Sequence, residues 1–220
     1  PTLTKHTSCC PDGIILGAAF HPQSITPPRL PPQQQTTLMA QKATVFKVDL
    51  QVSDMDRSYF QSHSLTVARH PSETDERMMV RLLAFALNAD ENLQFTKGLS
   101  SDNEPDLWLK NLHGGIEHWI EVGLPDERRI RKGCNQAEQV AIYTYGERTA
   151  PIWWKNIEGD LTRFDNISIY YLQPEDTTAI AAMAGRNMSL QATIQDGDIW
   201  LGGENNTIMI SPETWKTNNP

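Results

Sequence analysis

Apolar and polar residues alternate over several short stretches of the chain, which is the period of a β-strand that buries one face. The clearest stretch is residues 43–52, where the even-numbered positions from 46 to 52 are apolar and the odd-numbered positions between them are polar. Residues 188–203 predict a hairpin, because Asp196-Gly197 is a typical two-residue turn between strands. Further strand signals occur at residues 62–70, 105–111, 116–123, 140–145, 166–172 and 207–211.

Helical signals lie between these strands. Helices are predicted from the N-cap residue Ser72 to about Asn88, from Pro125 onward, over residues 150–159 and over residues 174–185. One apolar face of the first helix contains Met78, Met79, Leu82, Leu83 and Ala86. Because helices separate some strands while hairpins join others, the sequence predicts an α/β fold with a mixed sheet flanked by helices.

The first 38 residues differ in composition from the rest. They contain half of the 14 prolines, and residues 22–37 are a Pro/Gln-rich stretch that cannot build a packed core. Met39 precedes the first strand signal directly. We therefore predict that residues 1–38 are a disordered or non-native N-terminal extension and that residues 39–220 form one domain. The alternative is a secretory signal around residues 13–20, which the adjacent Asp12 disfavours.

Charge and cysteine content exclude several classes of protein. The net charge is −8, and since the first 38 residues carry +1, the remainder carries −9. Such a surface does not bind nucleic acid over its whole extent, although a local basic patch still can. The three cysteines are too few for a disulfide scaffold. Apolar runs are too short to span a bilayer, so we expect a cytoplasmic protein without a membrane partner.

Three acids could form a metal site. Glu76 lies at the edge of the apolar face of the first helix, whereas Glu73 points further out. Asp106 stands at the head of a strand, and Glu121 lies between apolar residues of the next strand, where its burial is costly without a partner. Carboxylates that converge repel each other unless a cation neutralises them, and Mg2+ prefers oxygen ligands. Such a metal can activate water and stabilise a phosphoryl group during transfer.

A basic helix follows these acids directly. Its predicted inner stripe contains Ile130, Cys134, Ala137 and Ala141, with Cys134 as a core residue rather than a nucleophile. The densest basic cluster of the chain comprises Arg128, Arg129, Arg131 and Lys132. This cluster could stabilise a transition state or bind nucleic acid. The plainer alternative is a solvated face in which Glu127 pairs with Arg131 one turn later.

Five long segments of the sequence resemble the YaeQ family of bacterial proteins. They are ARHPSETDERMMVRLLAFA, LQFTKGL, IEHWIEVGLPDERRIRKGCNQA, IYTYGERTAPIWW and LQATIQDGDIWL. The similarity extends from Met39 to about Trp215. The family's proteins begin with a Met followed by a segment like AQKATVFK, which supports Met39 as the natural start. The resemblance implies a restriction-endonuclease-like fold, a variant of the PD-(D/E)XK nuclease fold, with acids placed as in magnesium-dependent endonucleases.

The resemblance also implies a set of site residues. The PD element matches Pro105-Asp106, and the (D/E)-x-K element matches Glu121-Val122-Gly123. The helical acid matches Glu76, with Glu73 as the second choice. The implied ligands of Mg2+, or of Mn2+ as a substitute, are thus Glu76, Asp106 and Glu121.

The sequence departs from the nuclease pattern at one position. Gly123 stands where the catalytic lysine is expected. In related nucleases this role can move to the following helix, which nominates Arg129 or Lys132.

Three hypotheses follow. The first is a Mg2+-dependent nuclease that cleaves a phosphodiester and binds nucleic acid through the basic helix 128–132. The second is a catalytically inactive binding module with a nuclease fold, which Gly123 and the net charge of −9 favour. The third is that the acids form structural ion pairs with the arginines of that helix. The distances among the three carboxylates separate these hypotheses.

Overall fold

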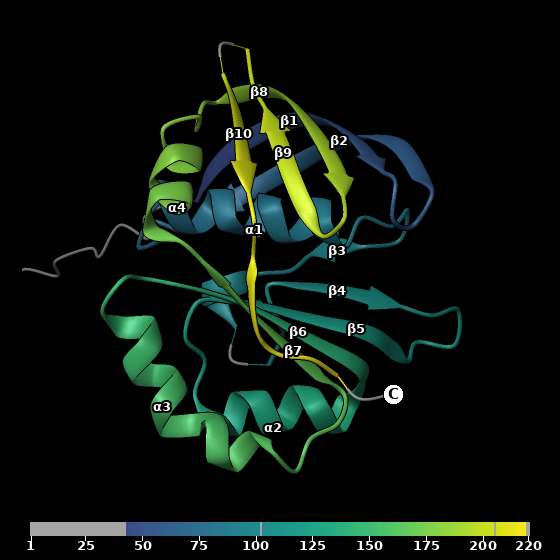
Figure 1. The fold of residues 1–220 in the computed structure, drawn as a ribbon. Coiled ribbons are helices and arrows are strands. Elements are labelled where there is room, and N and C mark those ends of the chain that lie inside the picture. The colour runs from purple at the N-terminus through teal and green to yellow at the C-terminus, as the bar shows by residue number, and fades with distance from the viewer. Residues whose placement is uncertain (1–42, 102, 205, 219–220) are drawn as a thin grey trace, which may run out of the picture. The chain divides into compact units, whose positions relative to one another are not determined.

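The computed structural model describes residues 43–101, 103–204 and 206–218. These residues form two β-sheets and four α-helices (Figure 1), so the predicted mixed α/β fold is confirmed. The extension predicted over residues 1–38 lies outside the described residues. None of the described helices is long and apolar enough to cross a membrane.

The first sheet has the strand order β10-β9-β8-β1-β2. Its strands are β1 (Thr44–Asp54), β2 (Tyr59–Arg69), β8 (Asn187–Gln195), β9 (Asp198–Gly202) and β10 (Thr207–Ile210). Strands β1 and β8 are parallel, and the other neighbouring strands are antiparallel. The alternation predicted for the first strand is confirmed by the buried residues Phe46, Val48, Leu50 and Val52.

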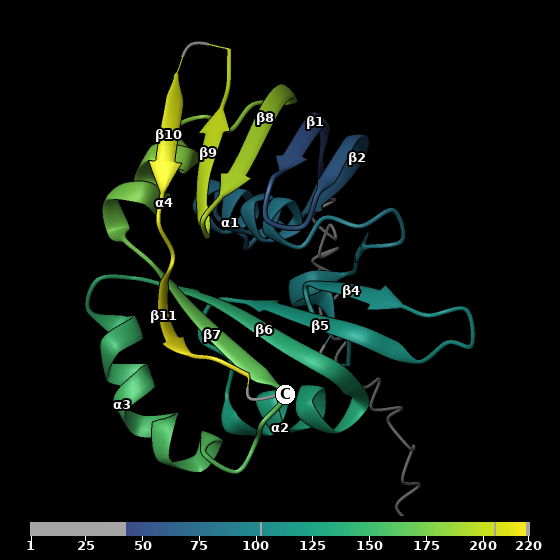
Figure 2. The same cartoon turned by 45° about the vertical axis from the view of Figure 1, so that its right-hand side comes forward.

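The second sheet has the strand order β11-β7-β6-β5-β4-β3. Its strands are β3 (Gln94–Phe95), β4 (Leu107–Lys110), β5 (Ile116–Val122), β6 (Ala137–Tyr145), β7 (Ile167–Leu172) and β11 (Glu213–Lys216). Strands β5, β6 and β7 are parallel. They are connected by α2 (Glu127–Gln136) and α3 (Thr149–Leu161), which cover the same face of the sheet (Figure 2).

Helix α1 (Asp75–Leu87) lies between the two sheets, beside α4 (Pro174–Ala181) (Figure 1). Every residue from Met78 to Ala86 is buried, including Arg81, so the prediction of a single apolar face was incomplete. The reason is that a helix packed between two sheets has little surface left for solvent. Its N-cap is Thr74, whose side chain accepts a hydrogen bond from the Arg77 backbone at 3.2 Å, and not the predicted Ser72.

A second hydrophobic core lies on the opposite face of the second sheet, under α2 and α3. Its buried members are Trp119, Ile130, Ala137, Val140, Ile142, Leu161, Ile167 and Ile169. Cys134 packs against this core as predicted, and burial raises the pKa of its thiol to about 11. The predicted helical stripe was wrong beyond Gln136, because Ala137 and Ala141 belong to β6.

Several other local predictions are confirmed within one or two residues. The Asp196-Gly197 turn has φ angles of 55° and 83°, as a two-residue hairpin turn with two left-handed positions requires. Helix α4, however, ends at Ala181 rather than near residue 185. Strands β3 and β11 were not predicted, because two and four residues of mixed character give no clear alternation.

Candidate functional site

A cleft of about 540 Å3 opens at the carboxyl ends of β5 and β6. It is lined by Glu76 and Arg77 of α1 and by residues 121–125 at and after the end of β5. Its other lining residues are Gly98, Leu99, Ser101, Arg129, Tyr145, Gly146 and Thr149. Two glycines let the chain turn away from the sheet here, since Gly123 and Gly146 have φ angles of 102° and 107°. At Gly146 a Cβ atom would also approach the Thr149 hydroxyl to 2.5 Å.

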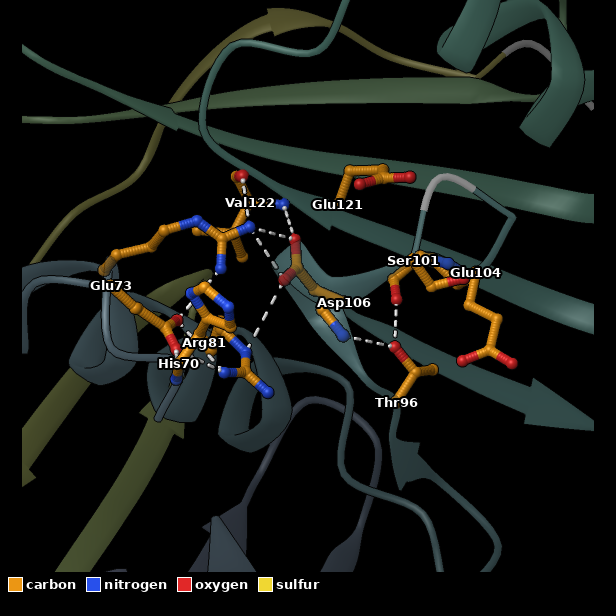
Figure 3. Close-up of polar contacts among 12 residues, drawn as sticks. His70, Glu73, Arg81, Thr96, Ser101, Glu104, Asp106, Glu121 and Val122 are labelled. Atoms are coloured by element: carbon orange, nitrogen blue, oxygen red, sulfur yellow. Dashed lines mark hydrogen bonds and ion pairs between the residues drawn. The ribbon is translucent and has the colours of Figure 1, made fainter. Parts of the chain in front are cut away.

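Asp106 lies beneath this cleft and is fully buried. Its carboxylate accepts a hydrogen bond from the Val122 backbone at 2.9 Å, which ties the start of β4 to the end of β5. Both carboxylate oxygens lie 2.8 Å from Nη2 of Arg77, and Nε of Arg81 is 3.6 Å from Oδ1 (Figure 3). The charge of Asp106 is therefore neutralised by arginines of α1.

The second-choice acid, Glu73, is also neutralised by these arginines. Both of its oxygens lie 3.0 Å from Nη1 of Arg81, and Nη1 of Arg77 donates to it at 2.9 Å. The expectation that Glu73 points outward was wrong, because the helix begins at Asp75 and Glu73 precedes its cap. Sequence reasoning missed both arginines, although the spacing of four residues from Glu73 to Arg77 and on to Arg81 was a usable signal.

Glu121 lines the cleft but is only 2% exposed. Its Oε1 accepts hydrogen bonds from Nε of Arg129 and from Nε1 of Trp119, both at 2.8 Å. Burial raises the pKa of Glu121 to about 7, and the neighbouring Arg129 limits this rise. Figure 3 shows the Glu121 carboxylate turned away from that of Asp106.

The two nominated cations of α2 lie on different surfaces. Arg129 reaches into the cleft, where its guanidinium also donates to the carbonyls of Ser101 and Glu104 at 3.4 and 2.6 Å. Lys132 does not line the cleft, and its Nζ lies 2.7 Å from Oδ1 of Asn103. The structure thus brings Glu76, Glu121 and Arg129 to one cleft.

These residues do not fit a Mg2+ site in the arrangement described. Within residues 43–101, 103–204 and 206–218, no group of three or more Asp, Glu, His or Cys side chains could hold a metal ion. Both oxygens of Asp106 and Oε1 of Glu121 already accept hydrogen bonds from arginines. A cation added at these three oxygens would meet the positive charge of Arg77 or Arg129.

A basic groove of about 530 Å3 adjoins the cleft. Its lining residues are Asn103, Asp126, Arg128, Arg129, Arg131, Lys132 and Asn135. Arg129 lines both the groove and the cleft, so the two cavities share this side chain. The predicted pair of Glu127 with Arg131 is present at 3.7 Å, and Arg163 lies 2.5 Å from the same Glu127 oxygen.

Residues 39–212 match a family model described as YaeQ protein. The chain belongs to the YaeQ family. The YaeQ protein of Escherichia coli K12 is 53% identical over 178 residues, which cover 81% of this chain and 98% of that relative. Its counterpart in Salmonella typhi is 51% identical over the same length and coverage. Both relatives are described as uncharacterised.

Two crystal structures of YaeQ proteins also match. The protein from Xanthomonas axonopodis pv. citri has a TM-score of 0.77 and 44% identity, and it covers 79% of this chain and 98% of its own. The protein from Pseudomonas syringae has the same TM-score with 32% identity, covering 81% and 98%. Four of the five segments that resemble the YaeQ family in the sequence contribute residues to the cleft, and LQATIQDGDIWL does not.

The Glu121→Gln variant of this YaeQ-family chain is expected to show a flatter dependence of stability on pH. The pKa of Glu121 rises from 4.5 to about 7 on folding. Between these values the folded chain binds more protons than the unfolded chain, so the free energy of unfolding falls as pH rises. The shift corresponds to at most about 3 kcal/mol. Urea unfolding between about pH 5 and pH 8 measures it.

The matched control is Glu117→Gln, on the same strand but outside the cleft. The control should retain the wild-type slope of stability against pH. An unchanged slope in Glu121→Gln would show that Glu121 is ionised throughout this range.

Proposed function

We propose that the chain is a nucleic-acid-binding module built on a variant of the PD-(D/E)XK nuclease-like fold, and that its cleft is catalytically inactive. The observation that carries this proposal is the pairing of Asp106 with Arg77 and of Glu121 with Arg129. Each of these two acids thus already has an arginine as its positively charged partner, where a nuclease would use a divalent cation. Gly123 stands at the position of the expected lysine, so the amino group that this lysine would supply is absent there.

The arrangement of the second sheet supports the fold assignment. Asp106 stands just before β4, and its backbone donates to the Ile120 carbonyl at 3.0 Å, beside Glu121. Two acids on adjacent strands, followed by a helix that returns a cation to the second acid, is the order that the PD-(D/E)XK resemblance implies. The chain keeps this order of elements, but its two acids form ion pairs with the chain's own arginines.

The basic groove supports a nucleic acid as the ligand. Arg128 and Arg131 are exposed on α2, and phosphate groups are recognised by such arginines. The groove shares Arg129 with the cleft, where Leu99 and Tyr145 can contact a base. Burial raises the pKa of Tyr145 to about 12, so its hydroxyl remains a hydrogen-bond donor at neutral pH. The excess negative charge of the rest of the chain confines binding to this region.

The double variant Arg128→Glu, Arg131→Glu is expected to bind oligonucleotides at least about 10-fold more weakly, because it removes two phosphate contacts and adds repulsion. Fluorescence anisotropy with single-stranded and duplex DNA and RNA probes measures the affinity at several salt concentrations. The slope of log affinity against log salt should also become shallower. Lys155→Glu, a single charge reversal at an exposed position of α3, should leave affinity unchanged. Equal binding by all three proteins would contradict the proposal.

A metal-dependent nuclease is the second candidate. It is favoured by the convergence of Glu76, Glu121 and Arg129 on one cleft, with Asp106 directly beneath. Calorimetry with MgCl2 and MnCl2 and a cleavage assay with the same ions separate the candidates. The binding module predicts no metal binding and no cleavage. The nuclease predicts cleavage that is lost in both Asp106→Asn and Glu121→Gln.

A further inference from the structure

Strand β2 is a long sheet edge, and no strand of the described residues other than β1 pairs with it. The described sheets end in four edge strands, of which β10, β11 and β3 contain four, four and two residues, whereas β2 contains eleven. The pairing of β2 with β1 is continuous from Arg69 to Tyr59, without a bulge that would twist the edge away. An edge of this length presents a row of backbone N–H and C=O groups that can pair with another strand.

The sequence of β2 also lacks the residues that usually prevent such pairing. Its eleven residues, YFQSHSLTVAR, include no Lys, Asp, Glu or Pro, and Arg69 is the last residue. Burial lowers the pKa of His63, so this residue adds no firm charge at neutral pH. Phe60 is 57% exposed. Natural edge strands are commonly protected by charge, proline or bulges, and of these β2 has only the charge of Arg69 at its end.

We propose that two copies of the chain pair through β2 in antiparallel orientation, with the two-fold axis at Ser64. The two five-stranded sheets would then form one continuous ten-stranded sheet. This register uses all eleven residues of each strand and places Arg69 opposite Tyr59 of the partner subunit. On the outer face, Phe60 meets Ala68 of the partner subunit, and the Ser64 side chains meet at the axis.

Neighbouring symmetric registers are less favourable. Centring the axis on His63 places Arg69 opposite Arg57 of the partner subunit, and facing like charges destabilise a strand pair. Centring it on Leu65 places Tyr59 opposite Pro71 of the partner subunit, where no backbone N–H is available. Self-complementarity about Ser64 therefore favours a second copy over an unrelated strand.

The contact is narrow, so the dimer should be reversible. An eleven-residue strand pair is about 36 Å long and falls at the low end of interface size, for which we expect a dissociation constant of about 1–100 µM. Sedimentation velocity of the full chain over this concentration range should show a monomer–dimer equilibrium. A single monomeric species throughout would overturn the proposal.

Two substitutions test the position of the contact. Ser64→Lys places two ammonium groups at the axis and should weaken the dimer at least about 10-fold. Thr66→Lys, which faces Ser62 of the partner subunit, should act similarly, with circular dichroism confirming that both variants fold. The matched control is Thr207→Lys, exposed on the other edge strand of the same sheet, which should leave the dimer intact. A dimer weakened by Thr207→Lys but not by Ser64→Lys would contradict this register.

Cross-linking gives an independent measurement. In a chain with Cys9, Cys10 and Cys134 changed to serine, Ser64→Cys should form a covalent dimer with a short bismaleimide, because facing Cβ atoms in an antiparallel pair lie about 5 Å apart. Thr207→Cys in the same background should not. Absence of the Ser64→Cys cross-link at concentrations where dimer sediments would place the contact elsewhere.

Discussion

Replacing Asp106 with alanine is expected to lower the free energy of unfolding by about 3–5 kcal/mol. The substitution removes the acceptor of the Val122 backbone and leaves Arg77 and Arg81 without one of their two carboxylate partners. Arg81 is buried between the sheets, where water cannot replace the lost interaction. Urea unfolding of the wild-type and Asp106→Ala proteins at neutral pH measures the difference.

Asp54→Ala is the matched control, because Asp54 is a carboxylate of equal burial with a more exposed partner. Asp54 pairs with Arg57 at 2.6 Å, but the Arg57 side chain is 43% exposed and can be solvated when the pair is broken. We expect a loss of only about 1 kcal/mol. Equal losses in the two variants would contradict the importance of the buried arginines. Because Asp106→Ala is expected to be less stable, loss of activity in this variant indicates the loss of a catalytic group only if the variant is shown to be folded.

Trp119→Ala is expected to lower the free energy of unfolding by about 3–5 kcal/mol. Trp119 is among the largest fully buried side chains and fills the space between β5 and α2. A Cβ atom placed on Gly133 of α2 would approach its ring to 3.0 Å, which shows how closely the helix packs on it. The variant also removes the indole N–H that donates to Glu121. Thermal and urea unfolding measure the loss.

Trp200→Ala provides the comparison for this prediction. Trp200 is a partly exposed tryptophan on β9, and its truncation should reduce stability by less than about 2 kcal/mol. If both tryptophan variants lower the free energy of unfolding equally, the packing of Trp119 between α2 and β5 contributes no more to stability than a partly exposed tryptophan does. Trp119→Phe, which retains an aromatic ring without the N–H, separates packing from the hydrogen bond.

The elements that the sequence predicted correctly are those whose structure is determined by residues close to one another in the chain. Alternation identifies β1 because one face packs on α1 and the other meets solvent, and the Asp196-Gly197 turn follows from backbone angles that these residues tolerate. The boundary at Gln136 was missed because Ala137 fits either a helix or a strand. Ala137 belongs to β6 because it pairs with Ile116, a residue that is distant in the sequence.

The candidate site was predicted only in part for a similar reason. The order of Asp106, Glu121 and the basic helix is visible in the sequence, whereas the partners of each carboxylate depend on how the layers stack. Asp106 meets Arg77 because α1 lies over the start of β4, and a one-dimensional pattern contains no information on that contact between residues 29 positions apart. Periodicity described α1 as amphipathic, so a buried arginine at position 81 was not expected.

The topology of the first sheet has a consequence for the order of folding. Strands β1 and β2 come early in the chain, but β8, the parallel neighbour of β1, follows the whole run from β3 to β7. The intervening second sheet is assembled mainly from neighbours in sequence, so its loops close at lower entropic expense. On a translating ribosome the early hairpin would therefore wait, with one edge of β1 unpaired, until β8 emerges. Chaperone contacts during synthesis are expected to concentrate on that hairpin.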